Sequence, residues 1–101
     1  MATNRASIAE MEIPEREAIL RLAASHGARD VRVFGSFARR EAAPASDLDV
    51  LVTMEAGRSL FDLIALGQDL ERLLGRSVQV ISDAGLSPHL RHQILAEAVP
   101  L

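Results

Sequence analysis

One predicted β-strand restricts how this chain can fold. Leu48, Val50 and Val52 alternate along it, so their side chains share one face, while Asp47 and Asp49 share the opposite face. The apolar face anchors the strand in a core, and the two carboxylates repel each other unless a cation lies between them. The strand therefore predicts a sheet with helices packed against it and a rigid support for a pair of acids.

The other segments alternate between helical and extended patterns, with a local signal at most boundaries. Pro14 suits a first helical turn, Gly27 and Gly75 suit helix ends, and Ser87-Pro88 suits a helix start. The predicted helices are 14–26, 37–42, 59–74 (or from 58) and 88–98; the predicted strands are 31–34, 48–52 and 77–81; residues 1–12 are a short helix or a lead-in. This order predicts the α/β (α+β) class, with a small mixed three-stranded sheet.

Three of the predicted helices have an apolar face, and that of the first is formed by Ile19, Leu20, Leu22, Ala23 and Ala24. The last helix has its predicted inner edge at Leu90, Ile94 and Leu95. The longer helix spaces seven apolar residues for burial: Leu60, Leu63, Ile64, Leu66, Leu70, Leu73 and Leu74. We interpret this apolar face as core first and as a partner groove second.

Composition excludes several classes of protein. The 101 residues suit one domain, since two cores need a longer chain. A net charge of −3 argues against general nucleic-acid binding, and the absence of cysteine excludes disulfides and thiolate metal sites. No apolar run approaches the roughly 18 residues of a membrane span, and residues 1–15 lack the apolar core of a signal peptide. We therefore expect a cytoplasmic protein without a membrane partner.

The stretch from Gly35 to Asp49 carries the candidate chemistry. A glycine lets the backbone approach a bulky anion, and the Ser36 hydroxyl can hydrogen-bond a phosphate oxygen. Free N–H groups at the start of the following helix add further donors. Asp47 and Asp49 point to one face of the next strand, and Mg²⁺ is commonly held by one or two carboxylates together with substrate phosphates. The combination predicts a nucleotide–Mg²⁺ site.

The same residues resemble a known motif. Gly35-Ser36, ten intervening residues and Asp47-Leu48-Asp49 look like the defining motif of the DNA polymerase beta-type nucleotidyltransferases. Residues 35–39 (Gly-Ser-Phe-Ala-Arg) and 46–52 (Ser-Asp-Leu-Asp-Val-Leu-Val) are similar to the minimal nucleotidyltransferases, the antitoxin partners of HEPN-domain ribonuclease toxins. The resemblance covers most of the chain and implies one such domain, residues 1–101, with the polymerase beta-like fold.

The resemblance also implies an activity. Members transfer AMP from Mg-ATP to a protein hydroxyl, often a tyrosine of the HEPN toxin. Carried onto this sequence, Asp47 and Asp49 are the catalytic and metal-binding residues, and Gly35, Ser36 and Arg39 bind the nucleotide. For the oligomeric state, the resemblance is compatible with a homo-oligomer and with a hetero-oligomer that includes the toxin.

One position departs from the family pattern. The third carboxylate of these enzymes aligns with Gln79, which cannot take a proton at neutral pH and adds no negative charge for a second metal. Asp83 is on the same nominal face but about 13 Å further along the strand. Three alternatives follow for the missing third carboxylate. The strand could slip in register, another acid such as Glu12 or Glu55 could enter the site, or catalysis could be weakened or lost. The competing interpretation is an antitoxin that acts by binding its partner.

Other polar residues remain ambiguous. Arg39 could contact phosphates or lie on a solvated helix face, and Arg40 suits the surface interpretation. His89 and His92 could share a helix face, but no acidic or histidine partner near them in sequence supports a zinc site. A small-molecule nucleotidyltransferase would need a further domain or partner to hold its acceptor.

Overall fold

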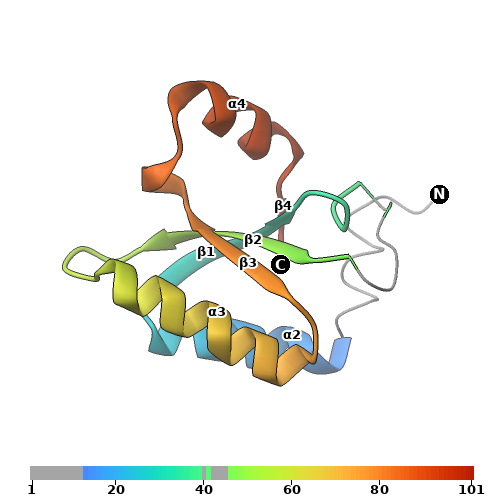
Figure 1. The fold of residues 1–101 in the computed structure, drawn as a ribbon, viewed down its shortest axis with the longest axis vertical. Coiled ribbons are helices and arrows are strands. Elements are labelled where there is room, and N and C mark those ends of the chain that lie inside the picture. The colour runs from blue at the N-terminus through green and yellow to red at the C-terminus, as the bar shows by residue number, and fades with distance from the viewer. Residues whose placement is uncertain (1–12, 40, 42–45) are drawn as a thin grey trace.

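The computed structural model describes residues 13–39, 41 and 46–101, which form a mixed sheet with helices on both of its faces (Figure 1). The helices are α2 (Ile13–Ser25), α3 (Leu60–Leu74) and α4 (Pro88–Glu97), with a 3-10 turn η1 (Asp83–Gly85). The strands are β1 (Ala28–Phe34), β2 (Leu48–Met54), β3 (Val78–Ser82) and β4 (Val99–Pro100). The predicted mixed α/β class is confirmed.

The predicted boundaries differ from these mainly around the turn after β1. In the described part of the predicted helix 37–42, residues 37–39 continue a turn that starts at Gly35 and no helix is formed. The prediction for residues 1–12 lies outside the described residues. None of the helices in the described part of the chain has both the length and the apolar character needed to cross a lipid bilayer.

The sheet has four strands in the order β3-β2-β1-β4, so the prediction of three strands was wrong by one. β1 is antiparallel to β2 and β4, whereas β2 and β3 are parallel. The additional strand has two residues, with Val99 opposite Val33 and Pro100 opposite Arg32. A two-residue strand containing proline has no recognisable alternation, and proline suits the edge of a sheet because it donates no ladder hydrogen bond.

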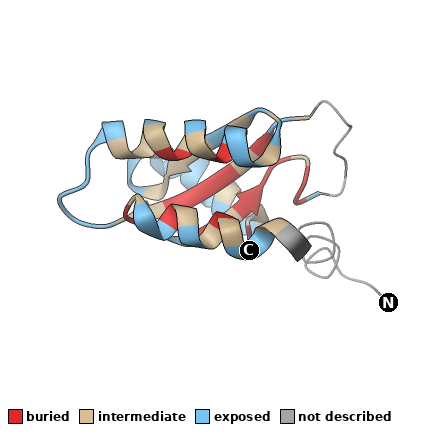
Figure 2. Cartoon of the chain, turned by 90° about the horizontal axis from the view of Figure 1, so that it is seen from below, coloured by how far each residue is buried: buried red, intermediate tan, exposed pale blue. Residues whose placement is uncertain are grey.

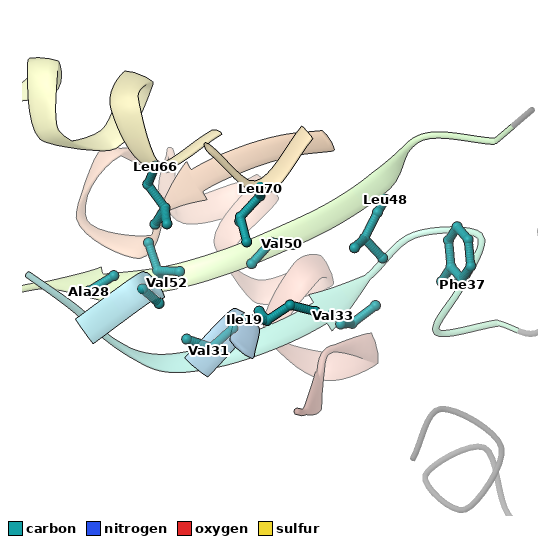
Figure 3. Close-up of a cluster of buried hydrophobic side chains, with 11 residues drawn as sticks. Ile19, Ala28, Val31, Val33, Phe37, Leu48, Val50, Val52, Leu66 and Leu70 are labelled. Carbon is teal, nitrogen blue, oxygen red and sulfur yellow. The ribbon is translucent and has the colours of Figure 1, made fainter. Parts of the chain in front are cut away.

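The core lies between the sheet and the pair α2 and α3, which sit side by side on one face (Figures 1 and 2). The apolar face of β2 is buried as predicted: Leu48, Val50 and Val52 are all at most 4% exposed. Figure 3 shows the side chains that meet them from both helices and from β1, among them Ile19, Val31, Val33, Leu66 and Leu70. β2 is therefore held rigidly by its buried face, and this fixes the backbone that carries Asp49 on the opposite face.

The helices bury less than their apolar patterns predicted. In α3 only Leu66 and Leu70 are buried, and Leu60 and Ile64 are 68% and 48% exposed. In α4 no residue is buried, and the expected inner-edge residue Leu90 is 49% exposed. The spacing of apolar residues indicates which face of a helix is suited to burial. Whether that face is buried depends on another helix or strand packing against it. Of the described helices, α2 and α3 share one face of the sheet and α4 lies on the opposite one (Figure 1).

Candidate functional site

The turn after β1 is built around Gly35. Its φ of +76° lies in the left-handed region, which residues with a side chain rarely adopt. A β-carbon at this position would stand 2.2 Å from Oδ2 of Asp49. The turn and the carboxylate are therefore in direct apposition, and only glycine permits so close an approach.

Asp47 and Asp49 lie at the start of β2. The pairing of β1 with β2 sets Phe34 opposite Asp49, which brings this carboxylate to the turn. Asp49 is half-buried and Asp47 is exposed. The pKa of Asp49 is raised, first because burial disfavours its charged form and then because Asp47 carries the same charge. The two acids thus lie close enough to repel each other beside the turn.

This pair of carboxylates fits a hard divalent cation. A Mg²⁺ ion favours oxygen ligands and usually keeps several waters or substrate phosphates in its coordination shell. Within residues 13–39, 41 and 46–101, no three His, Cys, Asp or Glu side chains are grouped so that they could hold a metal. Water and phosphate oxygens are the ligands with which a cation bound by Asp47 and Asp49 would ordinarily complete its shell.

Gln79 lies next to Asp49 on the neighbouring strand. The parallel register pairs Asp49 with Gln79 and continues without a shift to the pair Val52 and Ser82. Paired residues of adjacent strands point to the same face, so a neutral amide flanks Asp49 on that side. The strand slip that would bring Asp83 to this place does not occur.

The other acids considered as replacements are elsewhere. Asp83 lies in η1 beyond the end of β3 and accepts a hydrogen bond of 2.7 Å from Oγ1 of Thr53. Glu55 follows the opposite end of β2 from Asp49 and pairs with Arg58 at 3.4 Å. Glu12 is outside the described residues. Neither Asp83 nor Glu55 contributes a carboxylate to the Asp47–Asp49 pair.

Backbone hydrogen bonds close the turn and place Ser36 and Arg39 within it. The N–H of Arg39 donates to the Gly35 carbonyl at 3.1 Å, and the N–H of Glu41 donates to the Ser36 carbonyl at 2.8 Å. The Arg39 guanidinium is about half exposed and donates from Nε to Glu41 at 3.0 Å. It also lowers the pKa of Asp49, as expected of a cation near that carboxylate. Arg40 is outside the described residues.

Glu97, the last residue of α4, is part of this site although the sequence interpretation passed over it. Its Oε2 accepts a hydrogen bond of 2.9 Å from the N–H of Gly35, and Arg39 Nη1 donates to both of its carboxylate oxygens, at 3.1 and 3.3 Å. Its negative charge also raises the pKa of Asp49. No local signal marks Glu97, because its position depends on the pairing of β4 with β1.

His26 and the two histidines of α4 belong to different parts of the fold. His26, directly after α2, places Nε2 2.7 Å from Oδ2 of Asp69 within α3, and this contact lowers the pKa of Asp69. His89 and His92 are exposed on α4.

Comparison with known proteins gives consistent matches over nearly the whole chain. Residues 16–101 match the family model described as the nucleotidyltransferase domain. The Methanocaldococcus jannaschii protein MJ0435, whose name assigns it provisionally as a protein adenylyltransferase, is 41% identical over 80% of this chain and 87% of its own length. The protein adenylyltransferase MntA of Thermococcus cleftensis is 40% identical over 72% of this chain and 74% of its own length.

Solved structures share the fold. One, described provisionally as a minimal nucleotidyltransferase, superposes with a TM-score of 0.82 at 54% identity and covers 91% of this chain and 94% of its own. A crystal structure of a toxin–antitoxin with AMP-PNP gives a TM-score of 0.74 at 20% identity, over 83% of this chain and 69% of its own. The second likeness concerns the fold alone.

Proposed function

Because this chain belongs to the nucleotidyltransferase domain family, we propose that it transfers AMP from ATP to a hydroxyl group of a partner protein. The observation that carries the proposal is the apposition of the Gly35 turn and Asp49, with Asp47 beside it. Two relatives that are 41% and 40% identical over 80% and 72% of this chain carry the name protein adenylyltransferase, the first of them provisionally. The proposed partner is a HEPN-type toxin, so the chain would act as the antitoxin.

Each group of the site has a role in this reaction. The Gly35 N–H, the Ser36 hydroxyl and the Arg39 guanidinium would bind phosphate oxygens and hold the triphosphate in line with the acceptor. Asp47 and Asp49 would hold Mg²⁺, which neutralises phosphate charge and favours loss of pyrophosphate. The acceptor hydroxyl gives up its proton to solvent, its oxygen forms a bond to the α-phosphorus, and the bond from that phosphorus to the leaving pyrophosphate breaks. Since β2 is anchored by buried residues, the carboxylates need not reorganise when the nucleotide binds.

The experiment combines the chain with its candidate toxin, which we take to be encoded beside it, Mg²⁺ and ATP labelled at the α-phosphate. Label should pass to the toxin. The double variant Asp47→Asn, Asp49→Asn should reduce transfer by at least about 100-fold and abolish Mg²⁺-dependent nucleotide binding, because the charge for the cation is lost. Glu55→Gln is the matched control, since Glu55 lies at the other end of β2. An unchanged calorimetric titration with Mg-ATP in the double variant would contradict the site.

A specific observation favours a second candidate, an antitoxin that binds its partner without chemistry. Gln79 flanks Asp49 in the β2–β3 register and can neither accept a proton nor add negative charge. Under this alternative the chain and the toxin form a tight complex and no label is transferred.

The variant Gln79→Asp distinguishes the two candidates. If the chain is an enzyme limited by the neutral Gln79, an acid beside Asp49 should increase the transfer rate, by roughly tenfold or more. Gln79→Glu serves as a second acidic variant with a longer reach. No gain with either acid would mean that this position is not what limits the reaction.

A further inference from the structure

The carboxylate of Glu97 occupies two donors of the Gly35 turn. It accepts from the Gly35 N–H at 2.9 Å and lies 3.1 Å from Arg39 Nη1. A backbone N–H is a single donor, and a guanidinium that forms a charged pair with one anion has fewer donors left for another. These are the same two donors that the proposed function gives to nucleotide phosphates.

Glu97 acts there as an anion within an acidic neighbourhood. Its charge raises the pKa of Asp49, as the charge of Asp47 also does. Both Glu97 oxygens are engaged with the Gly35–Arg39 turn. The described residues also contain no three acids or histidines grouped around a metal site. Its contacts, with a backbone N–H and a guanidinium, are therefore those that a phosphate oxygen would make.

The helix that carries Glu97 can release it without losing a core contact. α4 has no buried residue, and its last residue is followed directly by Ala98 with extended backbone, φ −66° and ψ 140°. The chain beyond is held separately, since Val99 is buried and pairs with Val33 of β1. The Glu97 side chain can thus leave the turn while β4 stays in the sheet.

We infer that Glu97 is an internal competitor for the phosphate-binding donors of the Gly35–Arg39 turn, so that a polyphosphate binds by displacing its carboxylate. The inference rests on the proposed function for the nature of the displacing anion. In the free chain the Glu97 carboxylate binds the Gly35 N–H and the Arg39 guanidinium. A nucleotide phosphate has to replace this carboxylate at both donors. The affinity for the triphosphate is therefore lower than the turn alone would give.

The test compares the full chain with Glu97→Gln and Glu97→Ala. Two probes are titrated by calorimetry: Mg-ATP, and tripolyphosphate in the presence of a chelator so that no metal takes part. Both variants should bind both probes more tightly, Glu97→Ala by roughly tenfold and Glu97→Gln by less, since glutamine keeps an acceptor for the Gly35 N–H. Glu41→Gln is the control for the Arg39 contact alone, because Glu41 pairs with Arg39 Nε at 3.0 Å, whereas the Gly35 N–H donates to Glu97. It should therefore raise the affinity for either probe by less than Glu97→Ala does.

A second readout reports the exchange directly. The amide resonance of Gly35 in ¹⁵N-labelled protein should shift on Glu97→Ala and shift again when tripolyphosphate is added, and Glu41→Gln should leave it in place. Thermal unfolding of each variant checks that the fold is retained, and Glu97→Gln remains informative if Glu97→Ala does not fold.

The outcomes separate this inference from the proposed function. No gain in affinity for either probe overturns it, and weaker binding of Mg-ATP by Glu97→Gln overturns it in favour of a metal-ligand role. If wild-type chain binds Mg-ATP through Asp47 and Asp49 and the Glu97 variants bind equally, the function stands and the competitor role fails. If the Glu97 variants gain tripolyphosphate binding while no form binds Mg-ATP, the competitor role stands and the proposed function fails.

Discussion

At Gly35 the backbone has φ +76°, and Oδ2 of Asp49 lies 2.2 Å from where a β-carbon would stand. Gly35→Ala therefore adds two penalties, the left-handed conformation and an overlap with a carboxylate. We expect a loss of about 2–4 kcal/mol in the free energy of unfolding, measured with urea. Gly57→Ala is the matched control, since Gly57 has φ +87° but no atom near its missing β-carbon, and it should lose only about 1 kcal/mol.

A double variant isolates the overlap. In an Asp49→Ala background, Gly35→Ala should lose about as much stability as Gly57→Ala does, because the carboxylate is gone. If Gly35→Ala is equally damaging with and without Asp49, the two residues are not in contact.

At the residue scale, the end of β1 at Gly35 could be predicted from sequence, because it depends on neighbours in the chain. The roles assigned to Asp47, Asp49 and Arg39 stay predictions. Glu97 was missed because its partners Gly35 and Arg39 lie 62 and 58 residues away.

α3 and α4 both begin with a serine N-cap, but α3 packs into the core and α4 buries no residue. Ser59 Oγ accepts from the Phe61 N–H at 3.2 Å, and Asp62 Oδ2 accepts in return from the Ser59 N–H at 2.9 Å. α3 also buries Leu66 and Leu70, so its integrity is coupled to global unfolding. Ser59→Ala should therefore lower the free energy of unfolding by about 1 kcal/mol.

Ser87→Ala is the comparison for this prediction. Ser87 Oγ accepts from the Leu90 N–H at 3.4 Å, a longer contact, and α4 buries nothing. Its loss should change global stability by less than about 0.3 kcal/mol, because α4 can unfold locally first. Equal losses in urea for the two serine variants would show that α4 is as firmly integrated as α3.

The two ends of α3 could be predicted from sequence, whereas the burial of its apolar residues could not. Ser59 and Gly75 are local signals, and they mark its two ends correctly because a cap acts on the backbone next to it. The exposure of Leu60 and Ile64 was not predictable, since the same spacing would suit a covered face. Likewise β4 has no pattern of its own and exists only because β1 offers an edge to pair with.

The larger apolar core of the described residues lies on one side of the sheet, and a small second cluster joins Ala38 and Val99. α2 and α3 cover that side, whereas α4 lies over the face that carries Asp49 and the turn (Figure 1). α4 has no buried residue, and its C-terminal end is held by the connection to β4 and by the contacts of Glu97. We therefore expect α4, beside the proposed nucleotide site, to be less stable than the described helices that bury core residues.

Hydrogen exchange on the full chain tests this division. Amides of β2 and of the second half of α3 should exchange only through global unfolding, whereas those of α4 should exchange through local opening, at least about 100-fold faster. α2 is the matched control: it also lies at the periphery, but it buries Ile19 and Ala23 at 1% exposure each and should be protected like the core. Protection of α4 equal to that of α2 would place it in the same cooperative unit, and release of Glu97 would then require opening of the core. Fast exchange in α4 with slow exchange in α2 would mean that α4 can open locally over the face that carries Asp49. The sheet and its core would stay folded while it does so.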